Sequence, residues 1–342
     1  MIEMNTPFVI AEMSGNHGGN INNALELVRA AARSGASAVK LQTFTPDSMT
    51  LNVDKKEFYI NDSESLWNQQ HLYDLYKQAQ TPIDWHSAIF EEAKKNNIIC
   101  FSTPFDIEAV DFLETLDVPL YKIASFENNH VDLIKKVSKT KKPVIISLGL
   151  TTEEDIEIAV DSALSNGCTK LILLKCTSVY PAGLELANLL QIKKLKDKYK
   201  CIVGLSDHTI DDRAALVSLG LGAEVFEKHF KLNDDNSSVD SKFSMSEDLL
   251  KQYISNIKSG YIALGNGSFN LSSEELKSLK FKRSLIYVKD LKKGEKVNEF
   301  NVRALRPNIG MSPINFYKII GKSVNRNISI GEGVKLEDFD ES

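Results

Sequence analysis

The sequence contains few cysteines and has no net positive charge, and each of these properties excludes a class of protein. Four cysteines occur among 342 residues, without CxxC spacing, so neither a disulfide framework nor a thiolate zinc site is expected, and the thiols are predicted to be buried. The formal net charge is -5. Nucleic acids and acidic membrane surfaces require a basic face, so neither is expected as a partner.

Long apolar runs are also missing. No segment reaches the roughly 20 apolar residues that a membrane span requires. The first residues, MIEMNTPFVIAEM, contain no basic region followed by a long apolar stretch, as a secretory signal would. We therefore expect a cytoplasmic protein without a membrane partner.

The composition that remains is typical of a large globular protein. Apolar residues make up 42% of the chain and charged residues 25%, which provides enough apolar surface for a sizeable core. A chain of 342 residues is long enough for a barrel of about 250 residues and a small appendage. We expect two domains.

Short apolar runs alternate with helical patterns along most of the chain. Eight strands are predicted, at residues 8–13, 38–44, 98–105, 120–126, 143–149, 170–177, 202–208 and 224–230. This alternation is typical of an α/β protein, either a doubly wound open sheet or a TIM (β/α)8 barrel. We favour the barrel, because the eight strands follow one another without interruption and no GxGxxG motif follows the first.

The sequence changes character after Leu264. The stretch GNGSFNLSSEELKS is polar and rich in turn residues, and short strand-like pieces replace long helices from Phe281 onward. The pattern predicts a TIM-barrel catalytic domain at residues 1–265, a linker at 266–280 and a small β-rich domain at 281–342.

Polar side chains occur where the predicted strands end. In a TIM barrel the carboxyl ends of all the strands meet at one face, where active sites form. A barrel that served stability alone would need no such groups, so their convergence predicts a functional rim. The candidates are Glu12, Lys40, Gln42, Ser102, Thr103, Lys122, Ser125, Glu127, Ser147, Ser178, Tyr180, Ser206, Asp207, His208, Glu227, Lys228 and His229.

Two histidines on this rim suggest a metal. His208 and His229 end adjacent predicted strands, so their imidazoles reach a common point. Neutral imidazoles with added carboxylates or waters suit Mn²⁺ or Mg²⁺ better than a closed zinc site. With Glu12 as the one further ligand on offer, positions stay open for water and substrate, as a catalytic metal requires. The alternative interpretation is two unrelated core histidines.

A second set on the rim consists of cations and hydroxyls from separate strands: Lys40, Thr103, Lys122, Ser147 and Ser206. Charge-assisted hydrogen bonds from such groups hold phosphate and carboxylate strongly. Phosphoenolpyruvate carries both of these anionic groups and fits the set. A sugar phosphate fits it as well.

Seven motifs around these residues resemble those of the sialic acid synthase family, in family order and across nearly the whole chain. They are IAEMSGNH at residues 10–17, KLQTFTPDSM at 40–49, FSTPFD at 101–106, YKIASFE at 121–127, CTSVYP at 176–181, GLSDHT at 204–209 and EKHF at 227–230. The C-terminal part, with RSLIYVKDLKKGE and ALRPNIG, resembles the antifreeze-like SAF domain of these enzymes. Three motifs, IAEMSGNH, KLQT and YKIASFE, are more similar to pseudaminic acid synthases than to N-acetylneuraminate or legionaminate synthases.

The resemblance implies condensation of phosphoenolpyruvate with an N-acetylated sugar, here 2,4-diacetamido-2,4,6-trideoxy-L-altrose, with Mn²⁺ or Mg²⁺ held by His208 and His229. The phosphoenolpyruvate-binding residues that it implies are Lys40, Thr103, Lys122, Ser125, Ser147, Ser178, Tyr180 and Ser206. Sugar- or water-handling positions are matched by Glu12, Gln42, Glu127 and Asp240.

The resemblance also implies a domain-swapped homodimer, in which the tail of one subunit covers the barrel mouth of the other and Arg306 contacts the N-acyl sugar. The sequence departs from the family pattern in reading NSSVDS around Asp240, where relatives usually have GPD, and RPNIG instead of RPGxG. Two functions of other kinds stay open. One is a metal-dependent sugar-phosphate aldolase or isomerase, and the other is a carbohydrate-binding protein with a degenerate barrel.

Overall fold

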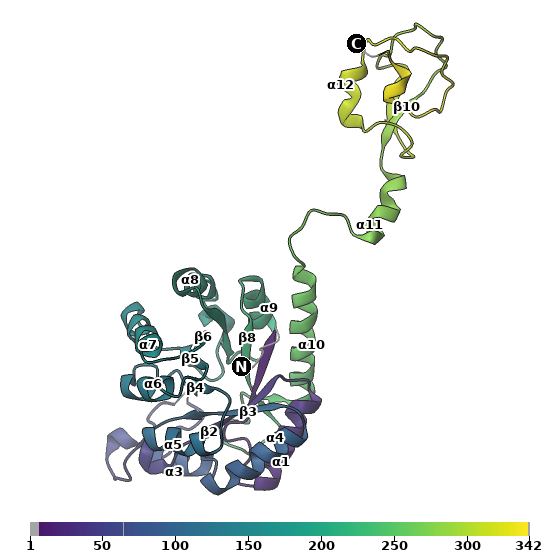
Figure 1. Cartoon of the computed structure of the whole chain (residues 1–342). Helices are drawn as coiled ribbons and strands as arrows, with labels where there is room; N and C mark the ends of the chain where they lie inside the picture. The colour runs from purple at the N-terminus through teal and green to yellow at the C-terminus, as the bar shows by residue number, and fades with distance from the viewer. Residues whose placement is uncertain (1–6, 64, 341–342) are drawn as a thin grey trace. The chain divides into compact units, whose positions relative to one another are not determined.

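The structure is a computed structural model, and it describes residues 7–63 and 65–340. The chain folds into two compact units, Met1–Gly265 and Asn266–Ser342 (Figure 1). The first unit holds all the predicted rim residues, and the second holds Arg306.

Eight parallel strands of the first unit close into a barrel. β1 (Phe8–Glu12) pairs with β2 (Ala38–Thr43) on one side and with β8 (Val225–Lys231) on the other. Between these strands lie, in chain order, β3 (Ile99–Pro104), β4 (Tyr121–Ile123), β5 (Val144–Leu148), β6 (Leu171–Cys176) and β7 (Ile202–Asp207). A short strand, β9 (Met245–Ser246), pairs in parallel with the last two residues of β8. The predicted TIM barrel is therefore confirmed.

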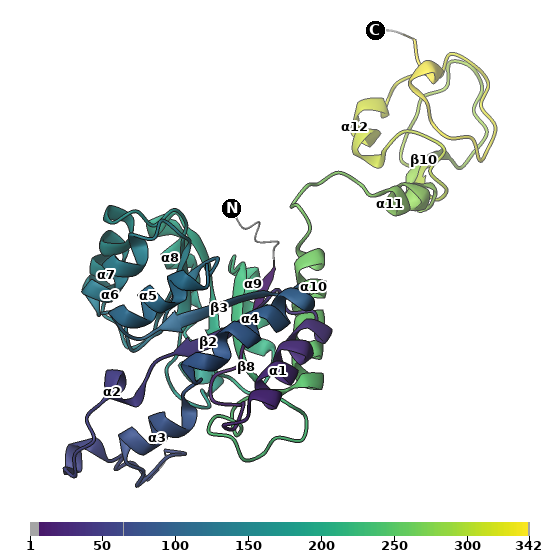
Figure 2. The same ribbon diagram turned by 60° about the horizontal axis from the view of Figure 1, so that its bottom comes forward.

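Helices follow each of the eight strands and surround the barrel (Figure 1). They are α1 (Ile21–Arg33), α2 (Pro46–Met49), α3 (Leu72–Ala79), α4 (His86–Lys95), α5 (Ile107–Thr115), α6 (Val131–Ser138), α7 (Glu153–Ser165), α8 (Leu190–Tyr199), α9 (Arg213–Gly220) and α10 (Glu247–Leu264). The segment with α2 and α3 stands apart from the ring of helices (Figure 2).

Side chains of the strands alternate between the barrel interior and the layer beneath the helices. In β1, Phe8 and Ile10 belong to the interior cluster, whereas Val9 and Ala11 pack in the larger cluster that also contains helix residues. The interior residues nearer the carboxyl ends of the strands are polar, such as Glu12 at the end of β1. The barrel is therefore filled with apolar side chains at one end and presents polar groups at the other.

β4 is shorter than predicted. Its pairing ends at Ile123 instead of continuing to residue 126, and a turn follows. In that turn the Nδ2 of Asn128 donates to the carbonyl of Ser125 at 2.7 Å, and also to the carbonyls of Ser147 at 3.2 Å and Gly149 at 2.8 Å. The amide thus engages a carbonyl that a longer strand would have used in pairing. As a result Ser125 reaches the barrel mouth from a turn.

The second unit has its own small core. β10 (Ser284–Tyr287) and β11 (Val302–Leu305) pair antiparallel, and Leu285, Tyr287 and Val302 pack in a cluster separate from the barrel core. Two short helices, α11 (Ser273–Ser278) and α12 (Phe316–Ile319), belong to this unit. The strand content is low, because most of the other pairings are isolated bridges.

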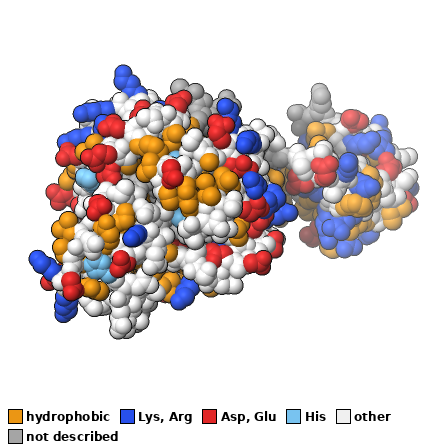
Figure 3. Space-filling view, turned by 90° about the horizontal axis from the view of Figure 1, so that it is seen from below, with side chains coloured by type: hydrophobic (Ala, Val, Ile, Leu, Met, Phe, Trp, Pro, Cys, Tyr) orange, Lys and Arg blue, Asp and Glu red, His pale blue; other side chains and the backbone are white. Residues whose placement is uncertain are grey.

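Two surface properties bear on possible partners. Among the described residues, no helix combines the length and apolar character that crossing a bilayer requires. On the face of the barrel unit in Figure 3, basic and acidic side chains are interspersed with hydrophobic patches. The described residues seen in that view form no broad basic area of the kind that nucleic acid requires.

Candidate active site

A pocket of about 340 Å³ lies at the carboxyl ends of the barrel strands. Its lining comes from strand ends and from the loops that follow them. The predicted site residues among the lining are Glu12, Lys40, Gln42, Lys122, Ser125, Glu127, Ser147, Ser178, Tyr180, Ser206, His208, His229 and Asp240. The structure therefore brings together groups that are far apart in the sequence, as the barrel interpretation predicted.

Four charged side chains form the buried floor of this pocket. The Nζ of Lys40 lies 2.6 Å from Glu12 Oε2 and 3.8 Å from Glu227 Oε1, and the Nζ of Lys122 lies 3.5 Å from Glu227 Oε1. Burial opposes ionisation of Glu227, but the two ammonium groups outweigh it and lower the pKa of this carboxyl. Burial also opposes the charge of Lys40, whose pKa the two facing carboxylates nevertheless raise. Cations and anions thus alternate along the floor.

Hydroxyl groups stand beside this floor. The Oγ of Ser147 is buried and has no hydrogen-bond partner within residues 7–63 and 65–340, so it is available to a ligand. Ser178 Oγ donates to Ser125 Oγ at 2.8 Å. This approach requires glycine at position 149, because a Cβ there would lie 2.2 Å from Ser178 Oγ. Thr103 does not line the pocket, and its Oγ1 accepts from Lys40 Nζ at 3.1 Å.

Glu127 approaches the pocket from the turn after β4. Its Oε2 is buried and has no hydrogen-bond partner among the described residues. Burial raises the pKa of Glu127 from 4.5 to about 7, although Lys122 and Lys40 oppose this rise. A carboxyl with such a pKa changes charge near neutral pH, as general acids and bases commonly do.

Asp240 is held by the loop that follows β1. Its Oδ2 accepts from Ser14 Oγ at 2.5 Å and from the Gly15 N–H at 3.2 Å. Gln42 joins this group to the floor, because its Nε2 donates to Ser14 Oγ at 3.0 Å and to Glu12 Oε1 at 2.9 Å. The unusual NSSVDS loop therefore still brings a carboxylate to the pocket.

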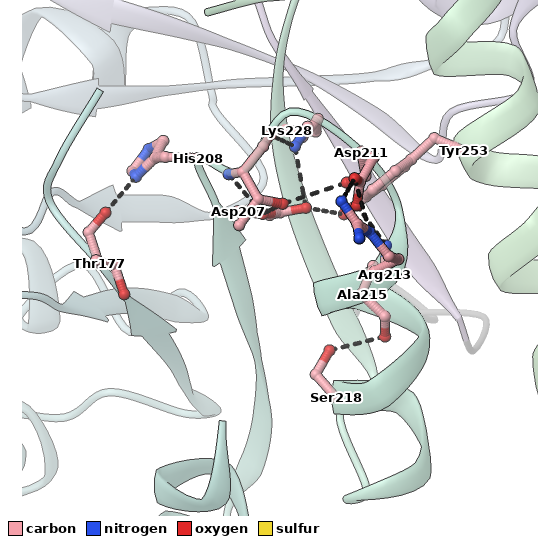
Figure 4. A network of polar contacts seen from close by, with 10 residues as sticks. Thr177, Asp207, His208, Asp211, Arg213, Ala215, Ser218, Lys228 and Tyr253 are labelled. Atoms are coloured by element: carbon pink, nitrogen blue, oxygen red, sulfur yellow. Dashed lines mark hydrogen bonds and ion pairs between the residues drawn. The ribbon is translucent and has the colours of Figure 1, made fainter. Parts of the chain in front are cut away.

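His208 and His229 lie side by side in the pocket, with ring centroids 5.3 Å apart. The Nδ1 of His208 lies 2.9 Å from the Thr177 carbonyl (Figure 4). Because a carbonyl only accepts, this Nδ1 carries the proton and the Nε2 lone pair is free for a ligand. The Nδ1 of His229 is buried and has no hydrogen-bond partner among the residues that the structure describes, and burial lowers the pKa of this imidazole well below its usual value. Aromatic packing holds the pair, since the Tyr180 ring lies 4.3 Å from that of His208.

The two histidines fit a metal that also binds water and substrate. Within residues 7–63 and 65–340, no group of three or more His, Cys, Asp and Glu side chains is arranged to hold a metal ion. A closed structural site is therefore not formed there. Two imidazole nitrogen donors match an open catalytic site: His208, with its Nδ1 bonded to a carbonyl, and His229, whose Nδ1 has no partner within the part of the chain that the structure describes.

The opposite wall of the lining is apolar, and the sequence alone did not predict it. Most of it comes from the segment between β2 and α4, namely Phe44, Met49, Ile60, Trp67, Leu72, Leu75, Tyr76 and Ala79. Trp67 connects this segment to the loop after β8, because its Nε1 donates to the Val239 carbonyl at 3.1 Å. Four of these residues recur at helical spacing on α3, namely Leu72, Leu75, Tyr76 and Ala79, and this period was the available sequence signal. The other four are widely spaced without a period, so only the folded segment brings them to the pocket.

Two other residues were missing from the predicted site. Glu227 was recognised only as part of the rim, yet it lies between the two floor lysines. The EKHF motif and the position of this glutamate two residues before His229 contained the signal. Asn128 gave no sequence signal, and its role depends on three carbonyls from two loops. Arg306 belongs to the second unit and is exposed.

Comparison with known proteins agrees with this arrangement. The NeuB family matches residues 27–269, and the SAF domain matches residues 282–340. The chain is 43% identical over 332 residues to the pseudaminic acid synthase of Campylobacter jejuni, covering 97% of this chain and 96% of the relative. It is 40% identical to the pseudaminic acid synthase of Helicobacter pylori, covering 98% of each chain. Identity to the N,N'-diacetyllegionaminic acid synthase of C. jejuni is 34%, covering 97% of this chain and all of the relative.

A solved structure gives the same result. The N-acetylneuraminic acid synthetase of Leptospira borgpetersenii superposes with a TM-score of 0.71 at 29% identity, covering 80% of this chain and 90% of that one. The similarity to enzymes of this kind is therefore found in the fold as well as in the sequence. With the family match spanning the barrel and full-length relatives at 40–43% identity, the chain belongs to the NeuB family, whose barrel is followed here by a SAF domain.

Proposed function

We propose that this protein is a pseudaminic acid synthase, which condenses phosphoenolpyruvate with 2,4-diacetamido-2,4,6-trideoxy-L-altrose and releases phosphate. The observation that carries the proposal is a pocket whose lining combines charged side chains and hydroxyl groups with a set of apolar side chains. The identity of 43% to a pseudaminic acid synthase, against 34% to a legionaminic acid synthase, supports this choice of substrate within the family. We also propose a cytoplasmic location, which was the expectation from the sequence.

The floor suits phosphoenolpyruvate. The ammonium groups of Lys40 and Lys122 supply charge for the phosphate and the carboxylate, and the Ser147 hydroxyl supplies a donor that has no other partner. Glu227 holds both lysines in place before the anion arrives. Hydroxyls of Ser125, Ser178 and Ser206, with Tyr180 and the Lys40-bound Thr103, complete the proposed phosphoenolpyruvate site.

The apolar wall suits the sugar. The proposed sugar has two N-acetyl methyl groups and a methyl group at carbon six, and side chains such as Ile60, Met49 and Leu72 cover such groups well. A sugar with more hydroxyl groups would place some of them against carbon atoms, where they find no hydrogen-bond partner. Gln42, whose amide already bonds to Glu12, is the proposed polar contact on this side.

We propose that His208 and His229 hold Mn²⁺ or Mg²⁺. When bound, the metal supplies a Lewis acid for the aldehyde oxygen of the open-chain sugar. The carboxyl groups of the protein act on the phosphoenolpyruvate part of the reaction. Once carbon three has bonded to the aldehyde carbon, positive charge remains at carbon two, and the Glu127 carboxylate stabilises it. Water then adds to carbon two and loses a proton to Glu12 or Asp240, after which phosphate leaves.

The tail is proposed to complete the sugar site from a second subunit. Large apolar side chains are exposed in the loops at the barrel mouth, where Phe126 is 58%, Leu150 72% and Ile210 69% exposed. Exposed apolar groups of this size commonly mark a surface that another molecule covers. In this proposed homodimer the planar donors of Arg306 contact the acyl oxygen of the sugar.

The direct test is phosphate release by the purified protein with phosphoenolpyruvate, Mn²⁺ and the sugar. Release that requires both substrates, with a product of the mass of a nonulosonic acid, supports the proposal. Phosphate release from phosphoenolpyruvate without the sugar, or cleavage of a sugar phosphate, would instead favour another enzyme class. Tight sugar binding without any turnover would favour a carbohydrate-binding protein.

Replacement of Lys122 by methionine is expected to weaken phosphoenolpyruvate binding by about 1.5 to 3 kcal/mol, because it removes one charged hydrogen-bond donor. The KM for phosphoenolpyruvate should rise, and that for the sugar should change little. Lys175→Met is the matched control, since Lys175 is a buried lysine on β6 that does not line the pocket. An equal rise of both KM values, or the same effect in the control, would contradict the assignment.

Activity is expected to depend on the ionisation of Glu127. The pKa of about 7 places the carboxylate form above neutral pH, so kcat/KM should increase with pH and level off above this value. Below pH 7 the increase should approach about tenfold per pH unit. Burial also raises the pKa of Glu12, a proposed base, to about 7, so in Glu127→Gln the ascending limb should become shallower and not vanish. The exposed control Glu154→Gln should keep the full limb. An unchanged limb in Glu127→Gln would rule out this residue as its origin.

A further inference from the structure

We propose that a buried ion pair outside the pocket, Asp207 with Lys228, positions both candidate metal-binding histidines. Asp207 directly precedes His208, and Lys228 directly precedes His229. The Lys228 Nζ lies 3.0 Å from Asp207 Oδ2, and both side chains are 1% exposed. The inference rests on the metal site proposed above and assigns a role to residues that do not line the pocket.

The strand geometry makes this pair a cross-link between the two histidine-bearing strands. Asp207 of β7 and Lys228 of β8 are direct partners in the strand register. Because side chains alternate along a strand, these two point away from the barrel interior, whereas His208 and His229 line the pocket. The ion pair therefore fixes β7 against β8 at the last residues before the histidines.

The ammonium group of Lys228 binds residues on both sides of His208. Lys228 Nζ binds the Asp207 carboxylate and also donates to the Thr209 carbonyl, in a short contact. The other carboxylate oxygen, Asp207 Oδ1, accepts from the Thr209 N–H at 2.9 Å and from Thr209 Oγ1 at 2.7 Å. Residues 207 and 209 are thus tied to each other and to β8, which leaves His208 little freedom to move.

A helix outside the barrel supports the pair. Tyr253 of α10, which is 1% exposed, donates its hydroxyl to Asp207 Oδ2 at 3.1 Å (Figure 4). Its ring also lies 5.4 Å from the Lys228 Nζ. The Asp207 carboxylate therefore accepts four hydrogen bonds and is fully satisfied. Only a defined arrangement of β7, β8 and α10 satisfies it in this way.

Stability alone does not explain a pair in this place. A buried ion pair contributes little net stability compared with apolar side chains of similar size, because both charges lose their hydration. In some proteins such a pair instead fixes the register between the elements that carry it, and we infer that role here from the partners of Asp207 and Lys228. Groups beyond the direct ligands orient metal-binding histidines in many proteins, and their loss typically weakens metal binding by about 10- to 100-fold.

The test is the Mn²⁺ affinity of the folded protein without substrates, measured by the electron paramagnetic resonance signal of free Mn²⁺. Asp207→Asn and Lys228→Met are each expected to weaken Mn²⁺ binding by about 10- to 100-fold. The double variant Asp207→Asn/Lys228→Met has no unpaired charge, so its thermal stability should recover. Its Mn²⁺ affinity should stay low, because the cross-link is still missing.

Two controls separate positioning from general stability. Leu133→Ala in α6 removes a fully buried side chain elsewhere in the barrel and should lower thermal stability without changing Mn²⁺ affinity. His208→Ala shows the affinity that remains without one ligand. Wild-type Mn²⁺ affinity in the single variants, or its return in the double variant together with stability, would overturn the positioning role. If wild type and His208→Ala bind Mn²⁺ equally weakly, the metal site itself is wrong, and the inference falls with it.

Discussion

His208→Ala and His229→Ala are each expected to lower kcat by at least ~10³-fold, because the aldehyde loses a Lewis acid that supplies several kcal/mol to its activation. A chelator should have the same effect on the unmodified protein, and added Mn²⁺ should restore turnover. The measurement is the initial rate of phosphate release at saturating phosphoenolpyruvate and sugar.

His86→Ala provides the matched control for the histidine variants. His86 is fully buried and bonds to Thr43 Oγ1 and the Pro82 carbonyl, but it does not line the pocket. Its loss should lower thermal stability and leave metal-dependent turnover of the remaining folded protein unchanged. Full activity after chelation, or activity losses as large in His86→Ala as in His208→Ala, would contradict the proposed metal site.

Arg306→Ala is expected to raise the sugar KM by about 10- to 150-fold, the effect of losing a charged hydrogen bond of about 1.5 to 3 kcal/mol. The KM for phosphoenolpyruvate should change little, because the floor of the barrel is untouched. Arg303→Ala is the matched control, since Arg303 is an exposed arginine three residues earlier in the same unit. Equal effects of the two variants would remove Arg306 from the sugar site.

Mixing two impaired proteins, at a sugar concentration far below the KM of Arg306→Ala, tests whether the arginine comes from a second subunit. In a heterodimer of His208→Ala and Arg306→Ala subunits, one of the two composite sites combines an intact barrel with an intact arginine. After random subunit exchange, about a quarter of the wild-type activity should return. No recovery after verified exchange would mean that each tail serves its own barrel or that Arg306 does not contact the sugar.

The barrel was predictable because its strands are buried on both faces and therefore appear as apolar runs. All eight predicted strands occur, with ends shifted by a few residues. β4 shows why boundaries are harder to predict. Nothing local to Ser125 distinguishes a strand from a turn, and Asn128 decides the outcome by binding carbonyls of two loops at once.

The polar half of the pocket was predictable for a related reason. Strand ends of a barrel converge, so Lys40, Lys122 and the two histidines had to share a rim once the fold was assumed. No comparable rule predicts that apolar side chains of the segment between β2 and α4 line the pocket. Ile60 and Trp67 lie in a segment without a clear period and reach the pocket only through the folded loop. Asp207 and Lys228 were predicted among the polar groups of the rim, but neither lines the pocket, because in the strand register they pair with each other on the outer side of β7 and β8.

The ratio of kcat/KM values for alternative sugars tests the central claim most directly. Phosphate release should be compared for 2,4-diacetamido-2,4,6-trideoxy-L-altrose, its stereoisomers and N-acetylmannosamine at fixed phosphoenolpyruvate and Mn²⁺. The account predicts that the L-altrose derivative gives the highest value and exceeds N-acetylmannosamine by at least ~10²-fold, since extra hydroxyls meet the apolar wall. An equal or higher kcat/KM for N-acetylmannosamine, or for another stereoisomer, would contradict it.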